Sequence, residues 1–143
     1  MSNETLTHLP WPFEFEMPLR WSDQDVLGHV NNARIITLIE EARIRWTRGF
    51  EPAGRFKFGT VVATLTINYL RPVHYQPEFR IQMAVTRIGT KSFTVRHVGI
   101  QNEAAAFDCT TVMVALAEDG VSSRALNDTE RAWLEAALMS AAV

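Results

Sequence analysis

The residues most able to do chemistry stand close together in the first quarter of the chain. They are two acids, a glycine, a histidine and two amides: Asp23, Asp25, Gly28, His29, Asn31 and Asn32. A carboxylate beside an electrophilic carbon can act as a nucleophile or as a general base. Taken alone, however, two acids in a turn are more simply explained as turn and capping residues. The structure expected for the next segment of the chain helps to choose between these two interpretations.

A long helix is expected directly after this cluster. Its apolar residues recur at helical spacing: Ile35, Leu38, Ile39, Ala42 and Trp46. Ile36 and Ile44 widen this apolar stripe, so we expect the helix to be buried over most of its circumference. Either Asn31 or Asn32 can cap the first turn, and Gly49 is a natural stop.

The start of this helix gives the acids a chemical partner. The first turn of an α-helix has unpaired backbone N–H groups and the positive end of the helix dipole. Such an end can stabilise negative charge that develops on a substrate oxygen. Asp25 precedes Asn32 by seven residues, close enough along the chain to share a site. A calcium loop is a poor alternative, because Leu27 and Arg34 stand where that loop needs oxygen ligands.

Composition narrows the possible environments and partners. The 143 residues, 47% hydrophobic and 21% charged, fit one compact soluble domain. A net charge of −2 gives no general attraction to nucleic acid or to anionic membranes, so neither is an expected partner. Cys109 is the single cysteine, which excludes an internal disulfide and favours a reducing compartment. No secretory signal or membrane-spanning stretch is visible, so the expected location is the cytoplasm.

Strands are expected on both sides of the long helix. Alternating apolar residues predict one strand over residues 13–21, with Pro18 indicating an edge or a bulge. From Thr60 onward the period is two, and four strands follow, the last over residues 105–117. Alternation blurs near His97–Gly99, which suggests a bulge. A short helix over residues 128–140 ends the pattern, and Asn127 begins a capping box there.

The order of these elements predicts the architecture. Strands and helices do not alternate, so a doubly wound parallel sheet is disfavoured. Short turns between the four late strands make them antiparallel neighbours. We therefore expect an α+β fold, with one long central helix against a curved antiparallel sheet. The expected parts are a loose leader over residues 1–12, a domain over 13–126 and a C-terminal helix over 127–143 packed on it.

The segment Asp23-Gln24-Asp25-Val26-Leu27-Gly28-His29-Val30-Asn31-Asn32 resembles a known family motif. It is similar to the motif before the central helix of hotdog-fold acyl-CoA thioesterases, closest to the 4-hydroxybenzoyl-CoA thioesterase-like branch. The resemblance extends to Tyr69–Val73, to Gly89–Phe93 and to the last long strand, and it covers residues 13–125. It implies a hotdog fold, in which the curved sheet wraps around the central helix.

The resemblance also implies roles for individual residues. Asp25 corresponds to the catalytic carboxylate, acting as nucleophile or general base in the hydrolysis of an acyl-CoA thioester. The backbone amide of Asn32 or its neighbour corresponds to the donor that polarises the thioester carbonyl. Gly28 and His29 correspond to the turn that shapes the pocket. The expected substrate-binding residues are Asn31, Thr60, Arg71, Lys91 and Ser92, with Lys91 near the nucleotide part. No cofactor or metal is implied.

One departure and two alternative functions accompany this hypothesis. Many family members have an aromatic residue where this chain has Ile35, which favours an aliphatic acyl group here. A hotdog dehydratase or hydratase would use His29 as its base, although a lone histidine in a turn is more often structural. A non-catalytic acyl-CoA-binding protein is the other alternative. Glu40 and Glu41 are interpreted as structural or ion-pairing residues, because Asp25 already supplies the acid.

The resemblance finally implies self-association. The expected homodimer joins two sheets edge to edge and is often paired again as a homotetramer. Its active site would lie at the interface, with Asp25 from one chain and Lys91 from the other. Phe56 and Phe58 are expected to line the acyl pocket. Cys109 lies in a strand pattern without a catalytic partner nearby and is interpreted as a core residue.

Overall fold

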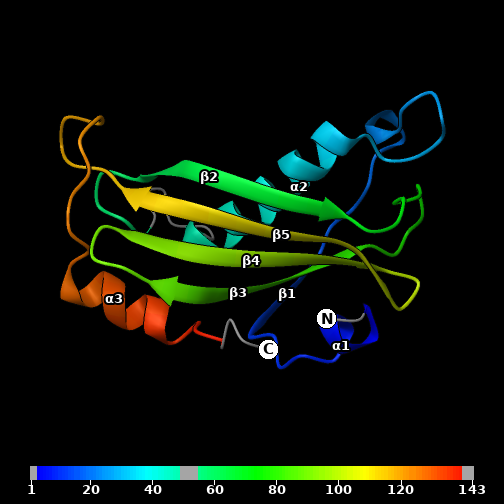
Figure 1. Cartoon of the computed structure of the whole chain (residues 1–143). Coiled ribbons are helices and arrows are strands. Elements are labelled where there is room, and N and C mark those ends of the chain that lie inside the picture. The colour runs from blue at the N-terminus through cyan, green and yellow to red at the C-terminus, as the bar shows by residue number, and fades with distance from the viewer. Residues whose placement is uncertain (1–2, 49–54, 140–143) are drawn as a thin grey trace.

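The computed structural model describes residues 3–48 and 55–139 and contains one five-stranded antiparallel sheet (Figure 1). The strands are β1 (Phe13–Glu16), β2 (Thr60–Tyr69), β3 (Arg80–Ile88), β4 (Ser92–Gln101) and β5 (Ala104–Ala115), and their order in the sheet is β1-β3-β4-β5-β2. The helices are α1 (Asn3–Thr7), α2 (Asn32–Arg48) and α3 (Asp128–Glu135), with a 3₁₀ turn, η1, at Trp21–Asp23. This is the α+β architecture expected from the order of the elements, and it is the hotdog fold that the resemblance implied.

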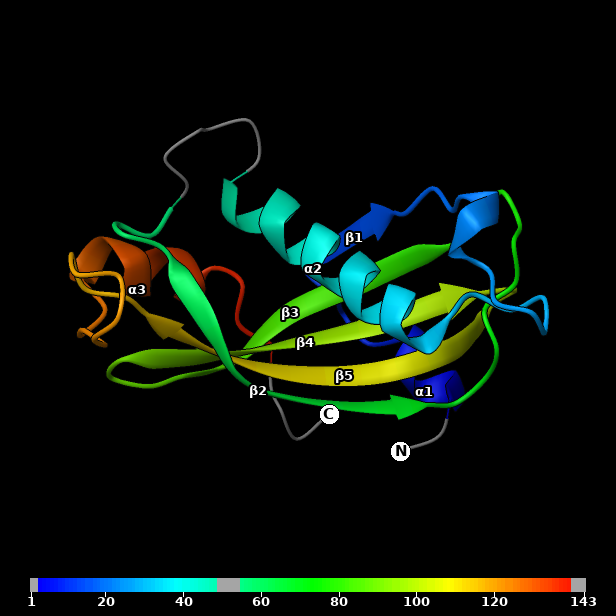
Figure 2. The same cartoon turned by 90° about the horizontal axis from the view of Figure 1, so that it is seen from above.

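Helix α2 lies across one face of the sheet, as Figure 2 shows. Its Ile35, Ile39 and Ala42 are buried in a core that includes Phe107 of β5. The opposite flank is open, and Ile44 is 44% exposed. The expectation that most of the circumference is buried was therefore wrong, because the sheet covers only one side of the helix. The predicted stop at Gly49 and the loop after it, through residue 54, lie outside the described residues.

The two faces of β5 both carry apolar residues, but they are buried to different extents. Thr111, Met113 and Ala115 are buried, while Val112 and Val114 are only partly so. The predicted bulge is confirmed by a register shift between β4 and β5 next to Gly99. A side chain at Gly99 would collide with the ring of Phe107, so glycine is required there.

An aromatic cluster closes the end of the sheet that carries α3. Trp46 of α2 stacks on Trp133 of α3 with ring centroids 4.4 Å apart, and Phe56 stacks on Phe93 at 5.1 Å. Phe56 is therefore a core residue of this cluster, and its expected place in the acyl pocket was wrong. The cluster attaches α3 to the sheet, and the helix ends at Glu135 rather than at residue 140.

The first residues differ from the sequence-based expectation. The strand predicted over 13–21 ends at Glu16, because Pro18 lacks the N–H that a continuing strand needs. The expected loose leader contains α1, which lies on the face of the sheet opposite α2 (Figure 2). Its Leu6 is buried against Val98 and Ile100 of β4. Among the described residues, none of the helices is long and apolar enough to cross a membrane.

Candidate active site

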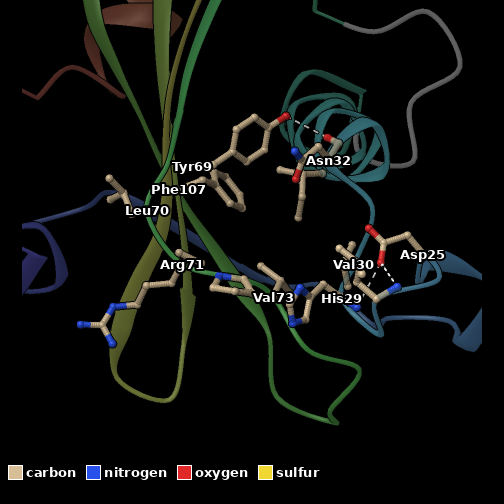
Figure 3. Close-up of a pocket in the computed structure, with 13 residues that line it drawn as sticks. Asp25, His29, Val30, Asn32, Tyr69, Leu70, Arg71, Val73 and Phe107 are labelled. Carbon is tan, nitrogen blue, oxygen red and sulfur yellow. Dashed lines mark hydrogen bonds between the residues drawn. The ribbon is translucent and has the colours of Figure 1, made fainter.

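A pocket of about 350 Å³ opens where the start of α2 meets the end of β2 (Figure 3). Its polar lining comes from Asp25, His29, Asn32 and Tyr69, together with the backbone and stem of Arg71. Its apolar lining includes Ile35, Val73 and Phe107. The structure thus brings the predicted carboxylate and the predicted helix start to one hollow.

The Asp25 carboxylate is fixed by the turn in which it lies. Its Oδ1 accepts hydrogen bonds from the backbone N–H groups of Leu27 (2.9 Å) and His29 (3.4 Å). Backbone bonds between Asp25 and His29 (2.8 Å) and between Gly28 and Asp25 (3.1 Å) close the turn. Gly28 has φ +79°, a left-handed conformation that glycine adopts without strain. Within the described part of the chain no donor is assigned to Oδ2, which leaves that oxygen available for chemistry.

The other acid of the motif has a structural role. Asp23 is buried, and its carboxylate accepts hydrogen bonds from the backbone N–H (2.8 Å) and the guanidinium (3.2 Å) of Arg20. Its backbone carbonyl accepts from the N–H of Asn31 at 2.9 Å. Asp23 therefore holds the loop in place, and Asp25 is the carboxylate on the pocket.

The start of α2 leaves backbone donors open. The Oδ1 of Asn31 accepts from the N–H of Ala33 at 2.8 Å, so Asn31 is the cap of this helix. Across residues 3–48 and 55–139, no acceptor is assigned to the backbone N–H of Asn32 or of Arg34. Asn32 also lines the pocket. An unoccupied carboxylate oxygen and an unoccupied amide are thus available at the same hollow.

His29 lies on the pocket, and its ring packs against a second histidine. The ring centroids of His29 and His74 are 5.1 Å apart in an edge-to-face arrangement. The adjacent backbone bond from Val30 N–H to the Val73 carbonyl, at 2.8 Å, attaches this loop to the segment after β2. These contacts are those of a residue that holds the turn against the pocket floor.

The predicted substrate-binding residues do not gather in one chain. The guanidinium of Arg71 extends away from Asp25 and the helix start (Figure 3). Thr60 and Ser92 pair with Ala115 and Val114 at the far end of the sheet, whereas the pocket lies where Tyr69 pairs with Phe107. Lys91, next to Ser92, lies at that far end too. The grouping of Thr60, Lys91 and Ser92 with Asp25 is therefore not met within a single chain.

The remaining candidate groups are occupied or enclosed. Glu40 forms an ion pair with Arg43 at 3.7 Å, as expected for a structural acid. Cys109 is buried, and burial raises the pKa of its thiol. Burial also lowers the pKa of His97 to about 3, so this imidazole is neutral. His97 is fully buried and does not line the pocket. Among the described residues, no group of three or more histidine, cysteine or acidic side chains could hold a metal ion.

Two residues that line the pocket were not predicted as site residues. Tyr69 and Phe107 looked like apolar positions of strands, because period two marks a strand face and not a pocket wall. The one available signal was the run from Tyr69 to Val73, which belongs to the resemblance described above.

Comparisons with known proteins agree with this architecture. Residues 19–139 match the thioesterase-like superfamily. A thioesterase from Thermus thermophilus, solved in complex with coenzyme A and Zn, is 28% identical and covers 88% of this chain and 93% of its own, with a TM-score of 0.79. A Xanthomonas campestris protein whose name proposes an acyl-CoA thioesterase is 33% identical over 74% of this chain and 93% of its own, with a TM-score of 0.66. The uncharacterized protein YsmA of Bacillus subtilis is 29% identical over 83% of this chain and 82% of its own.

Proposed function

Since the chain belongs to the thioesterase-like superfamily and is a thioester hydrolase, we propose that it cleaves acyl-CoA to a free acid and CoA. The observation that carries this proposal is the pocket shared by Asp25 and Asn32. One offers a carboxylate oxygen without an assigned donor, and the other a backbone amide without an assigned acceptor. The similar proteins from Thermus thermophilus and Xanthomonas campestris support CoA thioesters as the substrate class.

The proposed mechanism places the thioester carbonyl between these two groups. Its oxygen accepts a hydrogen bond from the Asn32 amide, which stabilises the charge that develops there. In one route Asp25 Oδ2 attacks the carbonyl carbon, CoA leaves as a thiolate that takes up a proton, and water hydrolyses the resulting anhydride. In the other route Asp25 removes a proton from water as it attacks, and the tetrahedral intermediate then expels the thiolate. Both routes need these protein groups and water, and we propose no cofactor.

The apolar part of the pocket supports an aliphatic acyl group. Ile35, Val73 and Phe107 form its apolar wall, and the first two present aliphatic side chains. Burying alkyl groups of a substrate there is favourable by roughly 0.8 kcal/mol per methylene. A screen over short, medium, long and aromatic acyl-CoAs would measure this preference directly.

The function of His29 is proposed to be structural. A hydratase would need its imidazole as a base, but the ring packs edge-to-face on His74. Its backbone N–H, at 3.4 Å, instead contributes to holding the Asp25 carboxylate.

We further propose that the active form is a homodimer joined through β2. This strand lies at the edge of the sheet, and its Val61 and Val62 are exposed. Two copies pairing antiparallel about the middle of β2 would bring Thr60 of one copy beside Tyr69 of the other. The far-end group of Thr60, Lys91 and Ser92 would then reach the second copy's pocket. Mass measurement in solution tests this arrangement, and a stable, active monomer would contradict it.

The substitution Asp25→Asn tests the catalytic assignment. It keeps the size of the side chain but removes the nucleophile or base, so kcat for acyl-CoA should fall at least about 10²-fold with an unchanged unfolding midpoint. Glu135→Gln, which neutralises an exposed acid on α3 next to β3 and away from the β2 edge, is the matched control and should leave kcat unchanged. Hydrolysis by Asp25→Asn at the parental rate would disprove the assignment.

A further inference from the structure

Tyr69 is the last residue of β2, and its phenol spans the space between that strand and the start of α2 (Figure 3). The Oη–H donates a hydrogen bond of 2.9 Å to the backbone carbonyl oxygen of Asn32, a residue 37 positions away in the sequence. The side chain is 44% exposed, so packing alone does not hold it. A directed polar contact fixes a ring that would otherwise have several rotamers available.

The other bonds that hold the first turn of α2 come from the helix itself and from the preceding loop, and they include the Ile35 N–H to Asn31 carbonyl bond of 3.0 Å. Asn32, Ala33 and Arg34 are exposed, and the buried packing of the helix begins only at Ile35. The Asn31 side chain and the Asp23 carbonyl hold the turn from the side of the preceding loop. Of the hydrogen bonds assigned to the described residues, the one from Tyr69 is what ties this first turn to the sheet.

We propose that Tyr69 is a positioning residue that keeps the Asn32 amide aimed at the thioester carbonyl, an inference that rests on the proposed function. The phenol does not touch the reacting atoms in this role. It fixes the carbonyl of Asn32 and so holds this residue against the sheet, while the bond from the Ile35 N–H to the Asn31 carbonyl (3.0 Å) orients the peptide plane that carries the Asn32 N–H. An oxyanion donor is effective only when it is already oriented at the moment of reaction, so a frayed first turn lowers kcat.

A second role of the same side chain must be separated from this one. The ring lines the pocket, and a wall residue acts on substrate binding through its shape. Tyr69→Phe keeps the ring and removes the Oη–H donor. A role in positioning predicts a loss in kcat with KM retained, whereas a role as a wall predicts no change in this variant.

The experiment compares Tyr69→Phe with Tyr75→Phe. Tyr75 is the other tyrosine of the chain, is exposed, and has no hydrogen bond assigned within the described residues. For Tyr69→Phe we expect kcat for acyl-CoA to fall roughly three- to tenfold, with KM changed less than about twofold. Tyr75→Phe should match the parent in both constants.

The affinities of two non-hydrolysable substrate analogues add a measurement that a purely structural role of Tyr69 would leave unchanged. A ketone analogue of acyl-CoA, with CH₂ in place of sulfur, retains the carbonyl that the Asn32 amide binds, and a thioether analogue lacks it. Tyr69→Phe should weaken the ketone several-fold and leave the thioether unchanged. An unchanged kcat, or equal weakening of both ligands, would overturn the positioning role. If the parent chain itself hydrolyses no acyl-CoA in the panel, the proposed function fails and this inference fails with it.

Discussion

The starts of the two longer helices, α2 and α3, have the same type of cap residue, but only α3 has the reciprocal hydrogen bond of a capping box. At α3 the Asn127 side chain accepts from the Glu130 N–H at 2.8 Å, and the Glu130 carboxylate accepts from the Asn127 N–H at 2.9 Å. At α2 the Asn31 side chain also accepts from the first turn, at 2.8 Å. The third residue after that cap is Arg34, whose side chain has no acceptor to return the bond.

This difference separates a helix start that is enclosed by side-chain bonds from one that lies on the pocket. We call the start of α3 closed because Asn127 and Glu130 bond to each other, Glu130 is buried, and Arg124 donates to both of its carboxylate oxygens at 2.8 and 2.7 Å. The start of α2 lies on the pocket with open amides and a cation in its first turn. Open amides and a nearby positive charge favour an incoming anion or a developing oxyanion. The start with a buried acid at its third position is thus the one away from the pocket, and the start with a cation there is the one on it.

The largest expected effect comes from opening the closed start with Glu130→Gln. Breaking this buried ion pair should lower the free energy of unfolding by about 3 kcal/mol, measured by urea denaturation. The effect on activity per folded molecule should be small, because within one chain α3 lies at the end of the sheet opposite the start of α2, which lines the pocket (Figure 1). Glu135→Gln, an exposed acid on the same helix, is the control. A large loss of kcat in folded Glu130→Gln would show that the two ends are not independent.

The same variant has a predicted pH signature. Burial opposes ionisation of Glu130, but the hydrogen bonds and charge of Arg124, together with the Asn127 N–H, hold the pKa of this carboxyl below its ordinary value. The stability it contributes is therefore present above the pKa of the unfolded state and is lost as the pH falls through the folded pKa. Glu130→Gln should lack this part of the acid-induced loss.

Closing the open start is the second test. Arg34→Glu reverses the charge in the first turn of α2 and so weakens the positive potential that favours a developing oxyanion at the Asn32 amide. We expect kcat/KM for acyl-CoA to fall about tenfold, while stability rises by a few tenths of a kcal/mol from the interaction with the helix dipole. Arg48→Glu makes the same change of charge at the other end of α2 and should leave kcat/KM nearly unchanged. Equal losses in both variants would assign the effect to net charge instead.

The smallest effects come from removing each cap. Asn31→Ala and Asn127→Ala should each lower the free energy of unfolding by about 1 kcal/mol. Only Asn31→Ala should also reduce kcat, by a few fold, because its helix start borders the pocket. If Asn127→Ala reduced kcat as much, the assignment of separate roles to the two starts would be wrong.

The sequence predicted those features of the fold that depend on neighbouring residues. Local spacing predicted helix α2, a cap at Asn31 or Asn32, the capping box at Asn127 and the bulge near Gly99. The structure contains all four, with Asn31 as the cap. The buried face of β5 did not follow, because both of its faces carry apolar or small residues and period two alone cannot distinguish them. Phe56 was misplaced for a related reason, since only its stacking on Phe93 shows where that aromatic side chain belongs.

Some residues of the candidate site could likewise be predicted from local sequence, and others could not. Asp25 and Asn32 stand seven residues apart in one motif, so their shared place could be expected. Tyr69 reaches the same pocket from a strand 37 residues beyond Asn32, and no local pattern records that contact. Thr60, Lys91 and Ser92 depend on an arrangement of two chains, which a single sequence specifies only through the exposed edge of β2.

The single thiol of the chain has a practical consequence. Cys109 lies within the core between α2 and the sheet, with no solvent exposure in the folded state. An alkylating reagent can reach it only when the sheet and the helix separate, so the rate of labelling follows the frequency of that opening. The labelling rate of Cys109 therefore reports how often the core opens. It can be measured for every variant discussed above without adding a probe.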